Sequence, residues 1–175
     1  MKFTVPSWCL CALLLCGVAA AQTASQSSAE DALGLSRNNQ QWVSLQPVED
    51  VSLPPGKPSA LTLHFQVSAG NHVNSNKPSS ALLIPTRLKL EPPAGLSVLK
   101  ISYPAGKDLT FPFDPDEKLN VYTGEFPVTV QLRGTKPGPH TIRGELTYQA
   151  CNDRACFPPK HLPVEFEVKV VSGKP

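Results

Sequence analysis

The 175-residue sequence contains no block of like charge and, beyond its N-terminus, no long apolar run. Its 16 basic and 14 acidic side chains are spread along the chain, so neither nucleic acid nor a polyanionic surface is indicated as a partner. A membrane-spanning helix needs about 20 apolar residues, and no segment reaches that length. The sequence also contains no recognisable glycine-rich phosphate loop and no Ser-His-Asp arrangement.

The N-terminus has the pattern of an export signal. Lys2 supplies a positive charge, Trp8 to Val18 is an apolar run, and Ala19-Ala20-Ala21 offers small residues for cleavage. We therefore predict a signal peptide over residues 1–21 and a periplasmic or secreted protein. Disulfides persist in such an oxidising compartment.

Two alternatives to cleavage after residue 21 stay open. The apolar run could remain as an uncleaved anchor, or Cys16 could carry a lipid. A lipid anchor is less favoured, because Leu15 occupies the position where a small residue is expected. With 21 residues removed, 154 remain, with no further membrane span and room for one domain with its own core.

Proline is abundant, and its 19 residues argue against long helices because each removes a backbone donor and clashes in a helix interior. From Trp42 onward, short runs alternate between apolar and polar residues. This period of two is typical of antiparallel strands with one buried face. The predicted strands are Leu61–Val67, Arg87–Leu90, Leu96–Ile101, Phe126–Leu132, Thr141–Tyr148 and Val164–Val170.

Turn residues between these runs complete the fold prediction. Segments such as Pro54–Gly56 and Pro92–Gly95 are typical of the connections in hairpins and sandwiches. The sequence therefore predicts an all-β protein, an immunoglobulin-like β-sandwich of seven to nine antiparallel strands over residues 42–172. Residues 22–41 are predicted to form a flexible leader, with a short helical turn near Ala29–Leu35.

Only two cysteines remain after the predicted signal peptide, Cys151 and Cys156. They lie between the strand that ends at Tyr148 and the last strand, and the residues between them are compatible with a turn. Closing so small a ring stabilises the fold by only about 2 kcal/mol in the loop-entropy treatment. A short disulfide in a surface loop is also more accessible to exchange. A structural staple and a redox centre both remain open from the spacing alone.

Three stretches of the sequence resemble one known family. They are Tyr148–Pro159, which contains both cysteines, Asn71–Pro78, and the closing Leu162–Val170. Together they are similar to the N-terminal periplasmic domain of the thiol:disulfide interchange protein DsbD. The resemblance extends over roughly Val43 to Val171.

The resemblance implies a redox function. In that family the domain is an immunoglobulin-like sandwich whose two cysteines cycle between disulfide and dithiol. The cysteine matching Cys156 forms mixed disulfides with partners, and Cys151 is then the resolving thiol. A thiolate attacks a disulfide sulfur, so no cofactor and no metal is needed.

The expected partners follow from the same resemblance. They are a thioredoxin-like electron donor and periplasmic proteins that carry disulfides. The sequence shows no Cys-x-x-Cys thioredoxin-like domain, so we expect the donor to be a separate protein. Whether the chain is an enzyme, as one component of a protein-disulfide reductase system, and which way electrons flow, are left open.

The resemblance also suggests residues that support the site. The family covers its disulfide with a mobile aromatic cap loop, and the corresponding segment is Thr110–Asp116, with Phe111 or Phe113 as the shield. The alternative is that both rings are ordinary core or strand-edge residues. Tyr148 could lean on the disulfide, donate its hydroxyl group to a nearby carbonyl, or simply face inward from its strand.

Charged residues near the cysteines are weaker candidates. Arg154 lowers and Asp153 raises the pKa of a neighbouring thiol if either lies close to it, but solvated loop charges are the simpler interpretation. The four histidines show no ligand spacing. His64 falls on the wet face of its strand, and His72 is predicted to lie in a polar loop.

Three classes of function are compatible with the sequence. The first is an exported thiol:disulfide exchange protein that uses Cys151 and Cys156. The second is an immunoglobulin-like binding or adaptor module whose disulfide is purely structural. The third is an exported metal-binding domain with zinc or copper held by both cysteines and His161, which is disfavoured because thiols in an oxidising compartment pair first.

Overall fold

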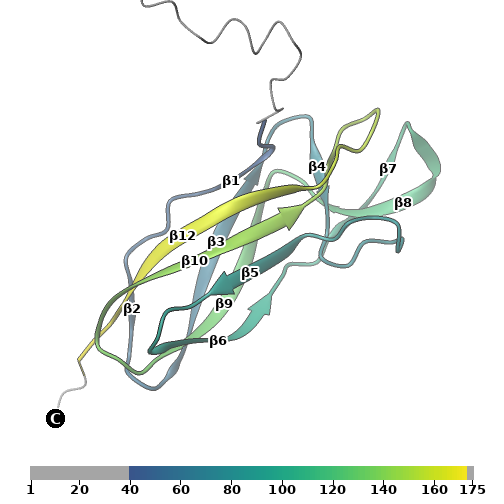
Figure 1. Ribbon diagram of the computed structural model, residues 1–175. Coiled ribbons are helices and arrows are strands. Elements are labelled where there is room, and N and C mark those ends of the chain that lie inside the picture. Colours follow the sequence, from purple (N-terminus) through teal and green to yellow (C-terminus); the bar gives the residue numbers. More distant parts are fainter. Residues whose placement is uncertain (1–39, 173–175) are drawn as a thin grey trace, which may run out of the picture. The chain divides into compact units, whose positions relative to one another are not determined.

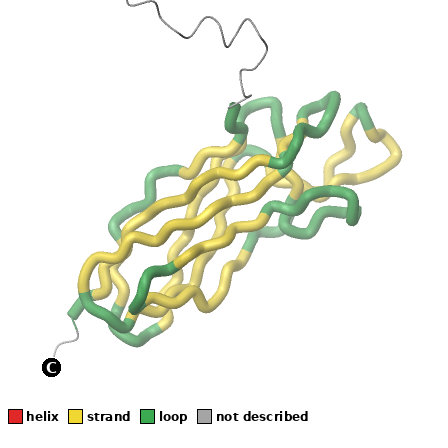
Figure 2. The backbone as a smooth tube through the Cα atoms, viewed as in Figure 1, coloured by secondary structure: helices red, strands yellow, loops and turns green. Residues whose placement is uncertain are grey.

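The computed structural model describes residues 40–172, which form twelve β-strands and contain no helix (Figures 1 and 2). Within this range, therefore, no helix could cross a membrane. The all-β immunoglobulin-like prediction is confirmed. The strands are β1 (Val43–Leu45), β2 (Val51–Leu53), β3 (Pro58–Val67), β4 (His72–Asn74), β5 (Arg87–Glu91), β6 (Leu96–Ser102), β7 (Lys107–Phe111), β8 (Asp114–Tyr122), β9 (Glu125–Gly134), β10 (Gly138–Tyr148), β11 (Ala150–Cys151) and β12 (Lys160–Val170).

Two four-stranded sheets form the layers of the sandwich. One has the strand order β1-β3-β9-β6 and the other the order β2-β12-β10-β5. In Figure 1, β12, β10 and β5 run across the layer formed by β3, β9 and β6. The pairings in both layers are antiparallel, except that β2 pairs with β12 in parallel through Val51 to Leu53.

The alternation in the sequence produces the core between the layers. Leu61, Leu63, Phe65 and Val67 of β3 are buried, as predicted, while the residues between them turn outward or are only half-buried. Apolar side chains of the opposite layer meet them. These are Ile142, Leu146 and Tyr148 of β10 and Val164, Phe166, Val168 and Val170 of β12. Burial of this apolar area is the main favourable term in folding.

A third sheet, with the order β11-β4-β8-β7, lies at one end of the sandwich (Figure 1). It accounts for most of the difference between the twelve observed strands and the seven to nine predicted. Strands of two or three residues, such as β4 and β11, are too short to show alternation. The predicted cap segment Thr110–Asp116 forms the end of the β7–β8 hairpin, with Pro112 and Phe113 in the turn between the two strands.

Several predictions fall outside the described residues. The signal peptide over 1–21, the lipid anchor at Cys16 and the helical turn near Ala29–Leu35 all lie within residues 1–39. They remain predictions from the sequence.

Candidate redox site

Cys151 and Cys156 form a disulfide at the end of the sandwich that carries the third sheet, with an S–S distance of 2.02 Å and a Cα–Cα distance of 3.9 Å. Cys151 ends β11 and is fully buried, whereas Cys156 is half-buried. The two cysteines also form an antiparallel bridge with each other. Therefore an approaching thiol has better access to the sulfur of Cys156 than to that of Cys151.

The four residues between the cysteines form a hydrogen-bonded turn. The Asn152 side-chain oxygen accepts hydrogen bonds from the backbone N–H groups of Arg154 and Ala155, both at 2.9 Å. The Asn152 N–H donates to the carbonyl of Ala155 at 3.0 Å. An Asx turn of this kind explains why a polar Asn follows the first cysteine. The turn holds the half-buried Cys156 beside β11.

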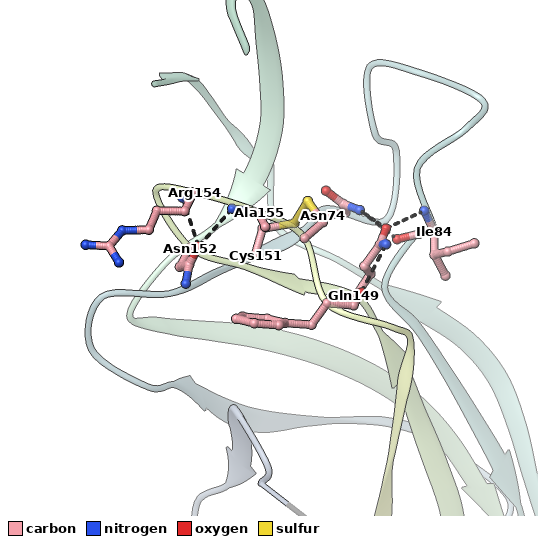
Figure 3. Close-up of a disulfide and its surroundings, with 9 residues drawn as sticks. Asn74, Ile84, Gln149, Cys151, Asn152, Arg154 and Ala155 are labelled. Atoms are coloured by element: carbon pink, nitrogen blue, oxygen red, sulfur yellow. Dashed lines mark hydrogen bonds between the residues drawn. A yellow bond between two sulfur atoms is a disulfide. The ribbon is translucent and has the colours of Figure 1, made fainter. Parts of the chain in front are cut away.

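Gln149 connects the disulfide loop to the neighbouring segments. Its side-chain oxygen accepts hydrogen bonds from the Asn74 amide at 3.0 Å and from the Ile84 N–H at 3.1 Å. Its amide nitrogen donates to the carbonyl of Phe157 at 3.2 Å. Figure 3 shows Gln149 pointing toward Asn74 and Ile84 beside the disulfide. Gln149 was not predicted as a site residue, although it lies inside the motif that carries the resemblance.

The residue after Cys156 anchors the other side of the loop. The Phe157 ring stacks on Trp42 with centroids 4.4 Å apart, and its N–H donates to the Ala150 carbonyl at 2.8 Å. Trp42 and Phe157 were both missed as site residues, because an aromatic pair separated by more than a hundred residues leaves no local pattern.

Tyr148 lies in the core rather than at the surface of the loop. It is fully buried, and its hydroxyl group donates to the Gln41 side-chain oxygen and accepts from the Trp42 N–H at 3.2 Å. Burial raises the pKa of the Tyr148 hydroxyl group above its usual value. The observed contacts therefore tie Tyr148 to the start of the domain.

His72 lies directly beside the disulfide. In the pairing of β4 with β11, His72 is the partner of Cys151. Its side chain is only 3 % exposed, so the prediction that it lies in a polar loop is wrong. Strand pairing with β11 and the cover supplied by Phe111 bury it, and neither could be read from the polar Asn71–Asn74 stretch. Burial lowers the pKa of His72 to about 4.

One of the two predicted cap residues, Phe111, lies over His72. The Phe111 ring stacks on the His72 ring with centroids 3.8 Å apart and an interplanar angle of 14°. The Phe113 ring stacks on Phe111 at 5.7 Å. Both phenylalanines are half-buried. The end of the β7–β8 hairpin thus contacts the residue paired with Cys151, which brings the predicted cap segment into the neighbourhood of the disulfide.

Two buried polar atoms in this sheet have no hydrogen-bond partner. They are Nε2 of His72 and Oδ1 of Asn74, and they are the only such side-chain atoms found among residues 40–172. Native structures rarely leave such groups unpaired, and a site with a chemical role is one setting in which they occur.

The other candidates lie away from the sulfurs. Asp153 and Arg154 are exposed and 4.0 Å apart at their charged groups, in keeping with solvated loop charges. His161 is also exposed, and its Nδ1 lies 2.7 Å from Glu145 Oε1. Across the described part of the chain, no three His, Cys, Asp or Glu side chains are grouped closely enough to hold a metal ion.

Comparison with known families agrees with this geometry. Residues 39–167 match the family model described as "Thiol:disulfide interchange protein DsbD, N-terminal". The chain belongs to this family. The matched region includes both cysteines, His72 and the β7–β8 hairpin, and the DsbD resemblance drawn from the sequence motif is therefore confirmed. No curated protein matches the chain.

Two solved structures are similar to the chain at low sequence identity. The N-terminal domain of Neisseria meningitidis DsbD in its reduced form is 21 % identical, with a TM-score of 0.44 over 79 % of this chain and 92 % of that one. The seventh ScaB type I cohesin of Pseudobacteroides cellulosolvens is 11 % identical, with a TM-score of 0.41 over 77 % of this chain and 95 % of that one.

Proposed function

We propose that this protein is an exported thiol:disulfide exchange protein that passes electrons between periplasmic partners through Cys151 and Cys156. The observation that carries the proposal is the unequal exposure of the two cysteines within a family of thiol:disulfide interchange domains. A half-buried Cys156 is open to attack by a partner thiolate. A fully buried Cys151 is shielded from partners and positioned to resolve the mixed disulfide.

The proposed reaction needs only the two sulfurs and a partner. A partner thiolate attacks Cys156 Sγ, the Cys151–Cys156 bond breaks, and Cys151 leaves as a thiolate. A second partner thiol then displaces Cys156 and leaves the dithiol. In the reverse direction, the Cys156 thiolate attacks a partner disulfide and Cys151 resolves the product. A thioredoxin-like donor and disulfide-bearing acceptors are the partners that this chemistry would serve.

The test uses two single-cysteine variants as a matched pair. Cys151→Ser leaves Cys156 free and should form a stable mixed disulfide with glutathione disulfide, measured by mass spectrometry of the folded protein. Cys156→Ser leaves only the buried Cys151 and should react at least about 10-fold more slowly, because access limits the attacking thiol. Equal rates for the two variants would contradict the proposed division of roles.

One observation favours a different function, an immunoglobulin-like binding module braced by the disulfide. Cys151 is fully buried, and the loop is closed by the hydrogen bonds of Asn152. A brace of this kind should resist mild reductants in the native state and have a reduction potential below about −300 mV. Equilibration of the native protein with glutathione or dithiothreitol separates the two functions. A higher potential with reversible opening supports exchange, and an inert bond supports the brace.

A further inference from the structure

We propose that His72 is a catalytic base of the exchange reaction, which accepts the thiol proton of Cys151 through its Nε2 atom. The inference rests on the proposed exchange function and deepens it by assigning a proton acceptor to the resolving step. It is carried by the register of β4 against β11, the burial of His72 and the unpaired Nε2.

The strand register places the two side chains together. Cys151 pairs with His72 on one side and with Cys156 on the other. Residues directly opposite each other in antiparallel pairs project to the same face, with Cβ atoms about 4.5–5.5 Å apart. Cys156, Cys151 and His72 therefore form a row across three neighbouring segments. The imidazole is the ionisable group in this row besides the two cysteines.

The unpaired Nε2 has a natural partner only in the reduced protein. A disulfide has no proton to donate, so the nitrogen has no donor beside it while the Cys151–Cys156 bond is closed. Reduction produces a thiol at Cys151, and the imidazole tautomer that carries its proton on Nδ1 can accept a hydrogen bond from that thiol. Pairing a buried polar atom in one redox state alone favours that state.

The environment keeps the imidazole neutral while the disulfide is closed, so the Nε2 lone pair is free to accept a hydrogen bond from the Cys151 thiol. Burial also weakens the imidazole as a base, and the proton transfer therefore depends on the Cys151 thiolate that forms beside the imidazolium and stabilises it. Phe111 covers the His72 ring by stacking on it, and Cys151 is the residue paired with His72 across the strands. Neither neighbour carries a charge while the disulfide is closed. Burial is the one cause of the lowered His72 pKa, with no contribution from a nearby charged group. An imidazolium ion at this place could not act as a base.

The step balances in atoms and electrons. Cys156 first forms a mixed disulfide with a partner and releases one partner thiolate. The Cys151 thiol then gives its proton to His72 Nε2, and Cys151 Sγ attacks Cys156 Sγ. The bond between Cys156 and the partner breaks, and the partner sulfur leaves with the electron pair. The proton on His72 passes to that thiolate or to solvent, and the cysteines end as a disulfide.

The test separates the resolving step from the first attack. The reduced protein is mixed with 5,5′-dithiobis(2-nitrobenzoate), which releases one coloured thiolate when Cys156 attacks and a second when Cys151 resolves. We expect His72→Gln and His72→Leu to slow the second, concentration-independent phase by about 100-fold, a typical effect of losing a general base. The first phase should change by less than about 3-fold, because Cys156 is the more exposed sulfur.

The matched control is His64→Gln. His64 also lies in a strand, β3, but its side chain is 48 % exposed and forms a hydrogen bond with the Glu125 carboxylate of β9. This variant should keep both phases at the rate of the parent protein. A second phase within about 3-fold of the parent in both His72 variants would overturn the role of a general base, whose loss has a far larger effect. A parent protein that shows no second phase would instead count against the exchange function itself.

A measurement on the unmodified protein guards against variants that fail to fold. The ¹⁵N chemical shift of His72 Nε2 should move on reduction as the nitrogen gains a hydrogen bond, while the shifts of His64 and His140 stay in place. A His72 shift that is the same in the disulfide and dithiol states would contradict the proposal, whatever the variants do.

Discussion

The interior between the two main layers and the interior beside the disulfide are both closed to solvent, yet they differ in chemistry. Between the layers, apolar side chains from β3 and β9 meet those of β10 and β12. Beside the disulfide, β4 buries His72 and Asn74, and each has one polar atom without a hydrogen-bond partner. The first region is built for stability, and the second retains groups that are costly to bury.

The difference shows that one short strand, β4, contributes both to the apolar core and to the site beside the disulfide. Val73 of β4 joins the apolar core, whereas His72 and Asn74 on either side of it face the disulfide and Gln149. Because side chains alternate along a strand, three residues suffice to connect the core to the site. Substitutions in the two regions should therefore have separable effects.

The largest effect on stability is expected in the core. Leu63→Ala removes a fully buried side chain at the centre of β3 and should lower the free energy of unfolding by about 2–5 kcal/mol, through lost burial and the cavity left behind. Urea denaturation measures the change. The rate at which dithiothreitol opens the disulfide in the folded protein should stay the same, and a large change in that rate would break the separation of the two regions.

Acid should lower the free energy of unfolding by about 3 kcal/mol through the protonation of His72. Each unit by which the folded and unfolded pKa values differ corresponds to about 1.36 kcal/mol. The folded pKa is about 4 against an ordinary value of 6.5, so between these values the unfolded chain binds a proton that the native state does not. Stability is then complete above pH 6.5 and falls as the pH approaches 4.

Urea denaturation at several pH values between 7 and 4 measures this loss. His72→Gln should show a smaller decrease than the parent, while His64→Gln should keep the full decrease. If the parent and His72→Gln lose stability equally, the imidazole is not buried as described.

Removal of the disulfide should have a smaller effect on stability than on chemistry. The double variant Cys151→Ala, Cys156→Ala closes no ring and should lose about 2 kcal/mol in the loop-entropy treatment. Calorimetry should show a folded protein with a lower melting temperature, and thiol exchange should be absent. A variant that cannot fold would mean that the loop stabilises the sandwich more than its length implies.

The smallest effect is expected at Gln149. Replacement by Ala removes the acceptor of the Asn74 amide and the Ile84 N–H and should lower the free energy of unfolding by about 1 kcal/mol, because the Asn74 amide still donates to the Ile84 carbonyl. Hydrogen exchange should accelerate at Ile84 and Phe157 before it does in β10. Thr147→Ala is the control, because Thr147 lies two residues before Gln149 and is also half-buried. This variant should leave the hydrogen exchange at Ile84 unchanged.

The long strands of the sandwich were predictable from the sequence, and the short ones were not. Burial of one strand face imposes a period of two on the sequence. This period predicted β3 from its buried residues Leu61, Leu63, Phe65 and Val67. The segment His72 to Asn74 is buried at every position, so it shows no alternation. The polar residues of this segment therefore led to the prediction of a loop.

The site was predictable only in part, for a similar reason. The spacing and context of Cys151 and Cys156 drew attention to the pair, and resemblance to a family proposed Phe111 or Phe113 as the shield. Residues that reach the site from distant segments left no trace in the local sequence. His72 reaches it across the β4–β11 pairing, and Trp42 reaches it through a stack on Phe157.

By itself, the sequence determined that this is an all-β sandwich with one close cysteine pair, because alternation and proline content are local properties of the chain. The tertiary structure decided which cysteine is the more exposed, which histidine pairs with the other cysteine, and which ring covers that histidine. Those features depend on segments tens of residues apart being brought together, and burial, which lowers the pKa of His72, exists only after the chain has folded.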